Sequence, residues 1–262
     1  MSFSAEKTLK RGLSEEGEDP PGKTLNMSLL GSRPPEEKLQ PPVPGEGREI
    51  PIRAEELVVI RSPHSSAAEQ FRRMRNSVQA LNPDGASRSI LMTSAAEREG
   101  KTIATLNLAL AMVELPQLRL LVIDSDLKQP AVEDYLGWPR RQGVSELLSG
   151  RISLDQAIRS TSVDRLDILG AGEPTPNPSI HLERLETVLN TLKRRYDYVL
   201  LDGPAVLRAS HPGLLGSISD GILLVVRLGV TPKQQVEEAF TLLENLGGNV
   251  LGTCATGAVG AR

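Results

Sequence analysis

The sequence predicts an α/β domain with a mostly parallel β-sheet and helices on both faces, preceded by a disordered N-terminal arm. From residue 55 onward, short apolar runs alternate with amphipathic stretches, as is typical of buried parallel strands connected by helices. Residues 1–54 contain eight prolines and one aromatic residue, so they can bury too little apolar surface to offset the entropy of ordering them. We therefore predict a disordered, proline-rich arm over residues 1–54 and one folded domain over residues 55–262.

Composition excludes several classes of protein. The chain has 262 residues, of which 30 are basic and 33 acidic, for a net charge of −3; this balance argues against a strongly basic nucleic-acid-binding protein. A single cysteine, Cys254, excludes a disulfide framework and a cysteine-rich zinc site. The sequence shows neither an apolar run of the roughly 18 residues that span a bilayer nor a secretory signal. We expect a soluble, cytoplasmic protein.

Capping and turn signals predict the first elements of the domain. Two serines followed by Glu69 predict the start of a helix over residues 65–81. The turn signal at residues 83–85 separates this helix from an apolar run at residues 89–94, which predicts a buried strand. Residues 102–114 place apolar side chains on one helical face and predict a second helix, which a proline ends.

The same alternation predicts the rest of the sheet. Apolar runs predict further strands at residues 118–124, 166–169, 198–202, 221–227 and 249–255. Amphipathic stretches predict further helices over residues 182–195 and 232–246. We interpret Gly203-Pro204 as a turn through which the chain leaves the sheet.

A phosphate-binding loop is predicted between the first strand and the second helix. The loop ends in Gly100-Lys101-Thr102, in the strand–loop–helix context that such a loop requires. The helix N-terminus offers unpaired N–H groups and a partial positive charge to a phosphate. Gly100 would let the backbone approach the phosphate, Lys101 would contact the β- and γ-phosphates, and Thr102 would place its hydroxyl on Mg²⁺.

This loop departs from the usual pattern. Ala95 stands where the first glycine is expected. Glu97 and Glu99 bring negative charge next to a polyanion, at roughly 1 kcal/mol for each close pair of unit charges in a water-like dielectric. Arg98 would offset part of that charge. The sequence therefore leaves weak nucleotide affinity as an open alternative.

Three acidic residues follow two of the predicted strands. Asp124 and Asp126 follow one apolar run, and Asp202 follows another. Ligands of open α/β sheets bind outside the carboxyl ends of the strands, where a carboxylate can reach Mg²⁺ directly or through water. Each aspartate could instead cap a turn. Their occurrence together with Gly-Lys-Thr favours a nucleotide site.

These motifs, in this order, resemble the cytoplasmic domain of the bacterial tyrosine kinases of capsular and exopolysaccharide synthesis, which are relatives of the Min and Par partition ATPases. The resemblance rests on Gly100-Lys101-Thr102, on Val-Ile-Asp124-Ser-Asp126 and on Tyr-Val-Leu-Leu-Asp202-Gly-Pro. It covers about residues 64–257. It implies a P-loop NTPase fold, with ATP and Mg²⁺ bound.

The resemblance also implies a role for each residue of the site. The nucleotide would be bound by Arg98, Gly100, Lys101 and Thr102. The metal would be held by Thr102, Asp124 and Asp202. Catalysis would depend on Lys101, Asp124, Asp126 and Asp202. Chemically, a carboxylate near the γ-phosphate can orient a tyrosine hydroxyl, while the lysine and Mg²⁺ stabilise charge on the transferred group.

A third motif concerns assembly. Glu69, Arg72 and Arg75 resemble the family's Glu-x-x-Arg-x-x-Arg motif, which makes contacts between subunits of a ring. Their spacing places them near one face of a helix. Without the resemblance, a pair of Glu69 with Arg72 or Arg73 on a solvated face is the simpler interpretation. The resemblance implies a homo-oligomer with these residues at the interface.

The chain differs from the family at several positions. Family members usually carry a C-terminal tyrosine cluster, whereas the tyrosines here are Tyr135, Tyr196 and Tyr198. Glu97-Arg98 replaces the Pro-Gly that commonly precedes x-Gly-Lys. The family's base-contacting asparagine aligns with Thr256, and an expected arginine is Lys128, a weaker bidentate donor.

The sequence leaves three functions open. In the first, the chain is an ATP-binding protein of exopolysaccharide synthesis or export that transfers the γ-phosphate to a partner protein. The second function is a switch that binds ATP and hydrolyses it slowly, and the third is a catalytically degenerate scaffold. The resemblance implies a transmembrane polysaccharide co-polymerase, or chain-length protein, as the partner, which would hold the chain at the inner membrane. A partition ATPase acting on DNA would need a basic surface that the charge does not suggest.

Overall fold

The computed structural model describes residues 54–174, 179–208 and 212–257, so the predicted arm lies almost entirely outside the described residues. The strands are β1 (Arg88–Ser94), β2 (Leu120–Asp124), β3 (Arg159–Ser160), β4 (Leu166–Leu169), β5 (Tyr198–Ala205), β6 (Gly221–Arg227) and β7 (Val250–Thr256). The helices are α1 (Val58–Arg61), α2 (Ser66–Ala80), α3 (Lys101–Val113), α4 (Val132–Leu136), α5 (Val144–Leu148), α6 (Leu154–Ala157), α7 (Ser179–Leu192), α8 (Pro212–Ile218) and α9 (Lys233–Asn245). None of these helices is both long and apolar enough to cross a membrane.

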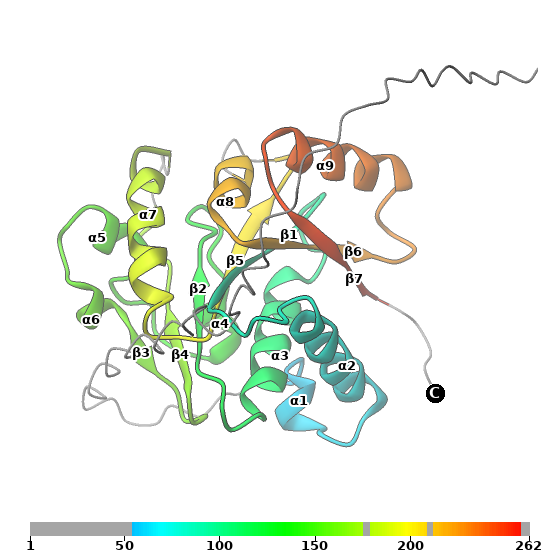
Figure 1. The fold of residues 1–262 in the computed structure, drawn as a ribbon, viewed down its shortest axis with the longest axis horizontal. Helices are drawn as coiled ribbons and strands as arrows, with labels where there is room; N and C mark the ends of the chain where they lie inside the picture. The colour runs from blue at the N-terminus through cyan, green and yellow to red at the C-terminus, as the bar shows by residue number, and fades with distance from the viewer. Residues whose placement is uncertain (1–53, 175–178, 209–211, 258–262) are drawn as a thin grey trace, which may run out of the picture. The chain divides into compact units, whose positions relative to one another are not determined.

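The strands of the described residues form one sheet in the order β3-β4-β2-β5-β1-β6-β7 (Figure 1). Every neighbouring pair is parallel except β3 and β4, which are antiparallel. The predicted mostly parallel sheet is therefore confirmed. Because β1 lies between β5 and β6, and β5 between β2 and β1, the carboxyl ends of β1, β2 and β5 lie next to one another.

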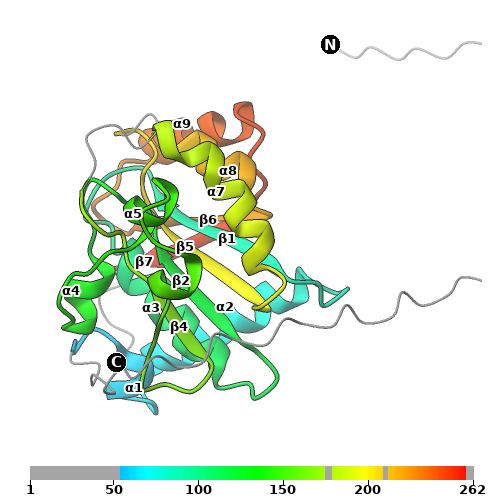
Figure 2. The same ribbon diagram turned by 90° about the vertical axis from the view of Figure 1, so that its left-hand side faces the viewer.

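Helices cover both faces of the sheet, as predicted. Side chains of α1 to α4 share one hydrophobic core, and those of α5 to α9 share the other. Alternate strand residues enter opposite cores: Leu200 of β5 enters the first, and Leu201 enters the second. Figure 2 shows α7, α8 and α9 on one side of the sheet and α1, α2 and α3 on the other.

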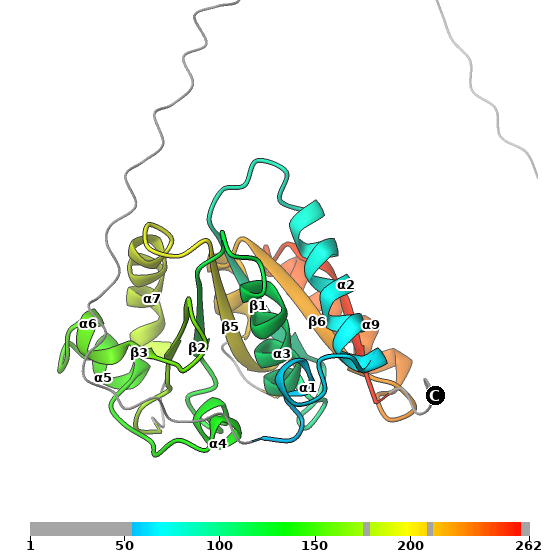
Figure 3. The same cartoon turned by 90° about the horizontal axis from the view of Figure 1, so that it is seen from below.

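Helix α3 is more deeply buried than its sequence suggests. The sequence predicts one apolar face, whereas all residues from Ala104 to Val113 are buried. One reason is that α2 packs beside α3 (Figure 3), and α1 contacts α3 as well. The N-cap of α2 is the predicted one, since the Ser65 hydroxyl accepts a hydrogen bond from the Ala68 N–H at 3.1 Å.

One predicted turn is wrong. Gly203-Pro204 does not lead the chain out of the sheet, because β5 continues to Ala205 beside the end of β1. The register shifts at this point, which accommodates a residue without an N–H. The Pro204 carbonyl accepts a hydrogen bond from the Thr93 hydroxyl at 2.6 Å. A Cβ at position 203 would lie 2.6 Å from the Leu91 side chain, so a larger residue there would require Leu91 to move.

Candidate nucleotide-binding site

The predicted phosphate loop connects β1 to α3 at the carboxyl edge of the sheet. Gly100 is the N-cap of α3 and has φ 89°, a conformation that a side chain disfavours. Its carbonyl accepts a hydrogen bond from the Ala104 N–H at 2.9 Å, so the helix is regular from its first turn. Lys101 and Thr102 therefore occupy the first turn of α3, where the helix N-terminus favours an anion.

The structure brings Thr102 together with the two strand-end carboxylates. Asp202 on β5 pairs in register with Asp124 on β2, so their side chains lie next to each other. The Thr102 hydroxyl donates a hydrogen bond to Oδ2 of Asp202 at 2.6 Å, and the Thr105 hydroxyl donates to Oδ1 at 3.4 Å. The first turn of α3 is thus fastened to β5. This connection links the phosphate loop to the predicted metal-binding carboxylates.

Asp124 and Asp126 also have the local role that the sequence left open. Oδ2 of Asp124 accepts hydrogen bonds from the N–H groups of Ala131 and Val132, at 2.9 and 3.0 Å, where α4 begins. Oδ1 of Asp126 accepts one from the Gln129 N–H at 3.0 Å. These two carboxylates organise the turn after β2, whereas the side-chain partners of Asp202 lie on α3. Asp202 is therefore the carboxylate most directly connected to the phosphate loop.

Burial perturbs the titration of this group of acids. Asp124 and Asp202 are only 1 % and 2 % exposed. Burial raises the pKa of Asp202 to about 7, although the Thr102 hydroxyl and the Lys101 ammonium oppose this rise. Burial, and then the charge of Asp202, raise the pKa of Asp124 well above its usual range. A divalent cation would offset this repulsion, because it stabilises both ionised forms.

Mg²⁺ fits this site only together with phosphate. In the described part of the chain, no group of three or more His, Cys, Asp or Glu side chains is placed to hold a metal. Mg²⁺ typically binds through one or two carboxylates, with water and substrate phosphates completing its octahedron. A hydroxyl and two acids beside a phosphate loop match that requirement.

Glu99 contacts a distant part of the chain. The residue is 3 % exposed, and its side chain accepts a hydrogen bond from the hydroxyl of Thr231, which precedes α9. This contact does not test the electrostatic penalty expected against a polyanion, which stays a prediction. No local sequence pattern predicts the contact, because 132 residues separate its two members.

Several bacterial proteins are similar to this chain in sequence. CapB of Staphylococcus aureus, which is named a putative tyrosine-protein kinase, is 30% identical over 198 residues, or 75% of this chain and 86% of CapB. The chain belongs to the bacterial tyrosine-protein kinase family. No family model matches it.

Solved structures place this kinase family member among the P-loop ATPases. The kinase domain of the Escherichia coli tyrosine kinase ETK has a TM-score of 0.75 and 26% sequence identity, covering 82% of this chain and 85% of that domain. The septum site-determining protein MinD of Pyrococcus horikoshii, complexed with Mg-ADP, has a TM-score of 0.55 and 27% identity, covering 64% of this chain and 69% of MinD. The predicted P-loop NTPase fold is thereby confirmed.

The arginines of the assembly motif make contacts within the chain. Arg72 donates to both carboxylate oxygens of Glu114, the C-cap of α3, at 2.7 to 3.1 Å. Arg75 donates to Glu114 at 3.1 Å and to the Ala111 carbonyl at 2.9 Å. Glu69 is only 3.7 Å from Arg72 and is half-exposed. In this chain the motif therefore joins α2 to α3, and its predicted contact between subunits stays a prediction.

Replacing Glu114 by glutamine is expected to lower the Tm by roughly 2 °C at neutral pH. The hydrogen bond from Arg72 holds the pKa of Glu114 below its ordinary value, although burial opposes this. An acid whose pKa is lowered by folding stabilises above its unfolded pKa, and this stabilisation is lost as the pH falls through the folded pKa. The difference in Tm should thus disappear below about pH 4. Glu69→Gln, measured in the same thermal scans, is the control, and its Tm should change little. An equal loss of Tm in both variants would contradict the role of Glu114 in joining α2 to α3.

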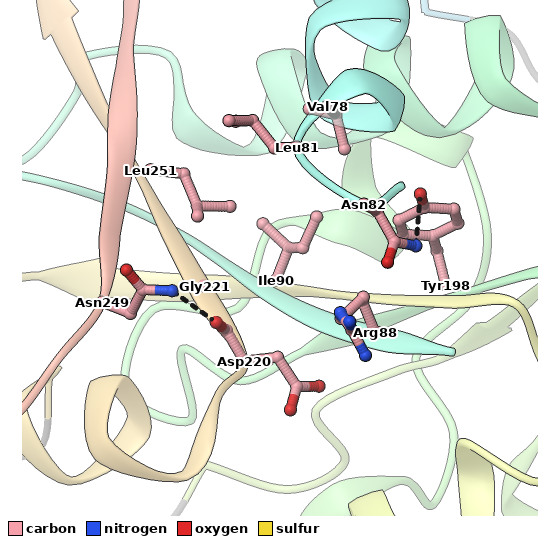
Figure 4. Close-up of a pocket in the computed structure, with 10 residues that line it drawn as sticks. All are labelled: Val78, Leu81, Asn82, Arg88, Ile90, Tyr198, Asp220, Gly221, Asn249 and Leu251. Carbon is pink, nitrogen blue, oxygen red and sulfur yellow. Dashed lines mark hydrogen bonds between the residues drawn. The ribbon is translucent and has the colours of Figure 1, made fainter. Parts of the chain in front are cut away.

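A separate cavity lies at the opposite edge of the sheet. Its volume is about 340 Å³, and it lies between the end of α2 and the first residues of β1, β5, β6 and β7 (Figure 4). Asn82 donates a hydrogen bond to the Tyr198 hydroxyl at 3.0 Å on one side, and Asn249 donates to the Asp220 carbonyl at 3.0 Å on the other. None of the predicted site residues lines this cavity. It is therefore not part of the nucleotide site.

Proposed function

We propose that this chain binds Mg-ATP at the end of β1 and transfers its γ-phosphate to a tyrosine of another protein of exopolysaccharide synthesis or export. The observation that carries this proposal is the hydrogen bond from Thr102 to Asp202. It joins the first turn of α3, where phosphate binds, to the strand-end carboxylate that would position the metal. Membership of the tyrosine-protein kinase family supports the same chemistry.

Each residue of the site has a specific part in the proposed reaction. Gly100 and the following N–H groups of α3 would bind the β- and γ-phosphates, and Lys101 would neutralise charge on the transferred group. Thr102, Asp124 and Asp202 would hold Mg²⁺, which draws charge from the phosphates when bound. Asp126 is less buried than Asp124, so we assign to it the orientation of the attacking tyrosine hydroxyl. The bond from the γ-phosphorus to this oxygen forms while the bond to the β–γ bridging oxygen breaks; the hydroxyl proton passes to the Asp126 carboxylate, and ADP leaves.

Two of the three tyrosines of the chain are poor phosphate acceptors because they are buried, whereas Tyr135 is half-buried. Tyr196 and Tyr198 are 1 % and 4 % exposed. The Tyr196 hydroxyl donates a hydrogen bond to Asp167 at 2.8 Å, inside the second core. A buried phenol cannot reach the phosphate of a nucleotide while the domain is folded. We therefore propose that the acceptor is a partner, with a transmembrane polysaccharide co-polymerase as the protein that recruits the chain to the inner membrane.

The test is phosphate transfer to a tyrosine-containing substrate. Purified chain is incubated with Mg²⁺ and γ-labelled ATP, together with a random copolymer of glutamate and tyrosine. We expect label on phosphotyrosine, and none when Lys101 is replaced by methionine. Hydrolysis without labelled copolymer would support an ATP-driven switch instead. Absence of both nucleotide binding and hydrolysis would support the catalytically degenerate scaffold.

A further inference from the structure

Three side chains hold the phosphate loop; they come from the end of β6, the end of β7 and the segment before α9. Nη1 of Arg227 donates a hydrogen bond to the Arg98 carbonyl at 3.2 Å, and the Thr256 hydroxyl donates to the Glu99 carbonyl at 2.7 Å. The Thr231 hydroxyl donates to Oε1 of Glu99. All three contacts fall on two consecutive residues of the loop, immediately before Gly100. The loop is thus attached to the far side of the sheet as well as to α3.

The hydroxyl of Thr231 makes two hydrogen bonds, one as acceptor and one as donor. It accepts a hydrogen bond from the Arg227 N–H at 3.2 Å, which occupies a lone pair of the oxygen. Its single hydrogen is directed to Glu99. Within the described residues, the other carboxylate oxygen of Glu99, Oε2, is buried without a hydrogen-bond partner. Thr231 is therefore the side chain that compensates the burial of this carboxylate.

The loop needs such a restraint because it contains no glycine before Gly100. Residues 95–99 are Ala-Ala-Glu-Arg-Glu. Arg98 nevertheless has φ 60°, in the left-handed region that disfavours a side chain. A glycine at this position would adopt the same conformation without that strain. The surrounding contacts must hold the backbone in place instead.

We propose that Glu99 and Thr231 form a clasp that holds the phosphate loop in its nucleotide-binding conformation. Both are positioning residues, since neither side chain is directed to the phosphates in our assignment. The proposal rests on the nucleotide binding proposed above. It gives the acidic residue before Gly100 a structural role. The buried carboxylate supplies the restraint that this loop needs and that a glycine-rich loop would not need.

The first test compares Mg-ADP binding by Thr231→Val and Thr231→Ser. Valine has nearly the shape of threonine but cannot donate to Glu99, whereas serine retains the hydroxyl. We expect the dissociation constant to rise about tenfold in Thr231→Val and to stay within about twofold in Thr231→Ser. Equal affinities of the wild type and Thr231→Val would overturn the proposal. Absence of Mg-ADP binding by the wild type would instead overturn the proposed function.

The second test removes the strain that the clasp opposes. Glycine at position 98 tolerates the left-handed conformation, so we expect Thr231→Val to raise the dissociation constant by no more than about threefold in an Arg98→Gly background, whatever Arg98→Gly itself does to nucleotide binding. A merely structural role of Thr231 would not be rescued by a change at Arg98. Additive or independent effects of the two substitutions would contradict the clasp.

A third measurement, hydrogen exchange, requires no nucleotide. It therefore still tests the proposal if a variant folds poorly. Hydrogen exchange of the ligand-free chain should be about tenfold faster at the amides of residues 96–101 in Thr231→Val, with the amides of β1 unchanged. Thr256→Val, which removes the contact to the Glu99 carbonyl, should give the same local change. Unchanged exchange in both variants would contradict the proposal whether or not nucleotide binds.

Discussion

Replacing Lys101 by methionine is expected to reduce phosphate transfer by at least about a hundredfold. Lys101 lies on the first turn of α3. Burial raises the pKa of both Asp126 and Asp202, and the Lys101 ammonium opposes this rise, which places it among the acids of the site. Methionine has a similar length and removes the charge. Removal of a single donor that stabilises transition-state charge typically costs a factor of about 10² to 10³ in rate.

The measurement is the initial rate of labelled phosphate release and of copolymer labelling, at saturating Mg-ATP. Lys233→Met is the matched control, because that lysine is 90 % exposed on α9 and pairs with Glu237 in the next turn. The control should keep the wild-type rate. More than about a tenth of the wild-type rate in Lys101→Met would contradict the assigned role of the lysine.

Replacing Asp202 by asparagine is expected to stabilise the ligand-free chain while removing its response to Mg²⁺. Burial raises the pKa of Asp202 to about 7, compared with about 4 in an unfolded chain. Between these values the folded state binds a proton that the unfolded state releases, so wild-type stability falls as the pH rises. Asparagine does not titrate. Relative to the wild type, the free energy of unfolding of the variant should be about 2 kcal/mol higher at pH 8 and little changed at pH 4. The value at pH 8 allows for weaker hydrogen bonds from Thr102 and Thr105.

Urea unfolding at several pH values measures this difference. Asp220→Asn is the matched control, with an expected effect of opposite sign on stability. Burial raises the pKa of Asp220, but the hydrogen bonds from Ser89 and Lys193 outweigh burial and lower this pKa. Its carboxylate stabilises the fold above the unfolded pKa, and this stabilisation is lost as the pH falls through the folded pKa. Asp220→Asn should therefore be destabilised at neutral pH. A loss of stability in Asp202→Asn at pH 8 would contradict the account of the buried carboxylate.

Local patterns were sufficient to predict the elements that carry the site. The apolar runs before Ser94, Asp124 and Asp202 are long enough to indicate buried strands, and each forms a strand at the predicted place. Gly100-Lys101-Thr102 begins a helix as expected. Short elements were missed: α1, α4, α5, α6 and α8 have at most seven residues, which is too few to show a helical period.

The contacts that hold the site could not be predicted from one sequence. Glu99 meets Thr231, and Arg72 meets Glu114, across intervals of 132 and 42 residues. No local pattern specifies such pairs, because they follow from which strands and helices become neighbours in space. The structure consequently changes the meaning of two predicted motifs. The acid before Gly100 is part of a buried clasp, and the arginines of the assembly motif hold α3.

Calorimetric titration of nucleotide into the wild-type chain tests the central claim most directly. Mg-ADP and Mg-ATP are titrated with Mg²⁺ present and again with the metal chelated. We predict saturable binding that weakens at least about tenfold without Mg²⁺, because the buried acids Asp124 and Asp202 need the cation beside the phosphates. No binding at millimolar nucleotide, or binding that is independent of Mg²⁺, would contradict the claim that these residues form a nucleotide site.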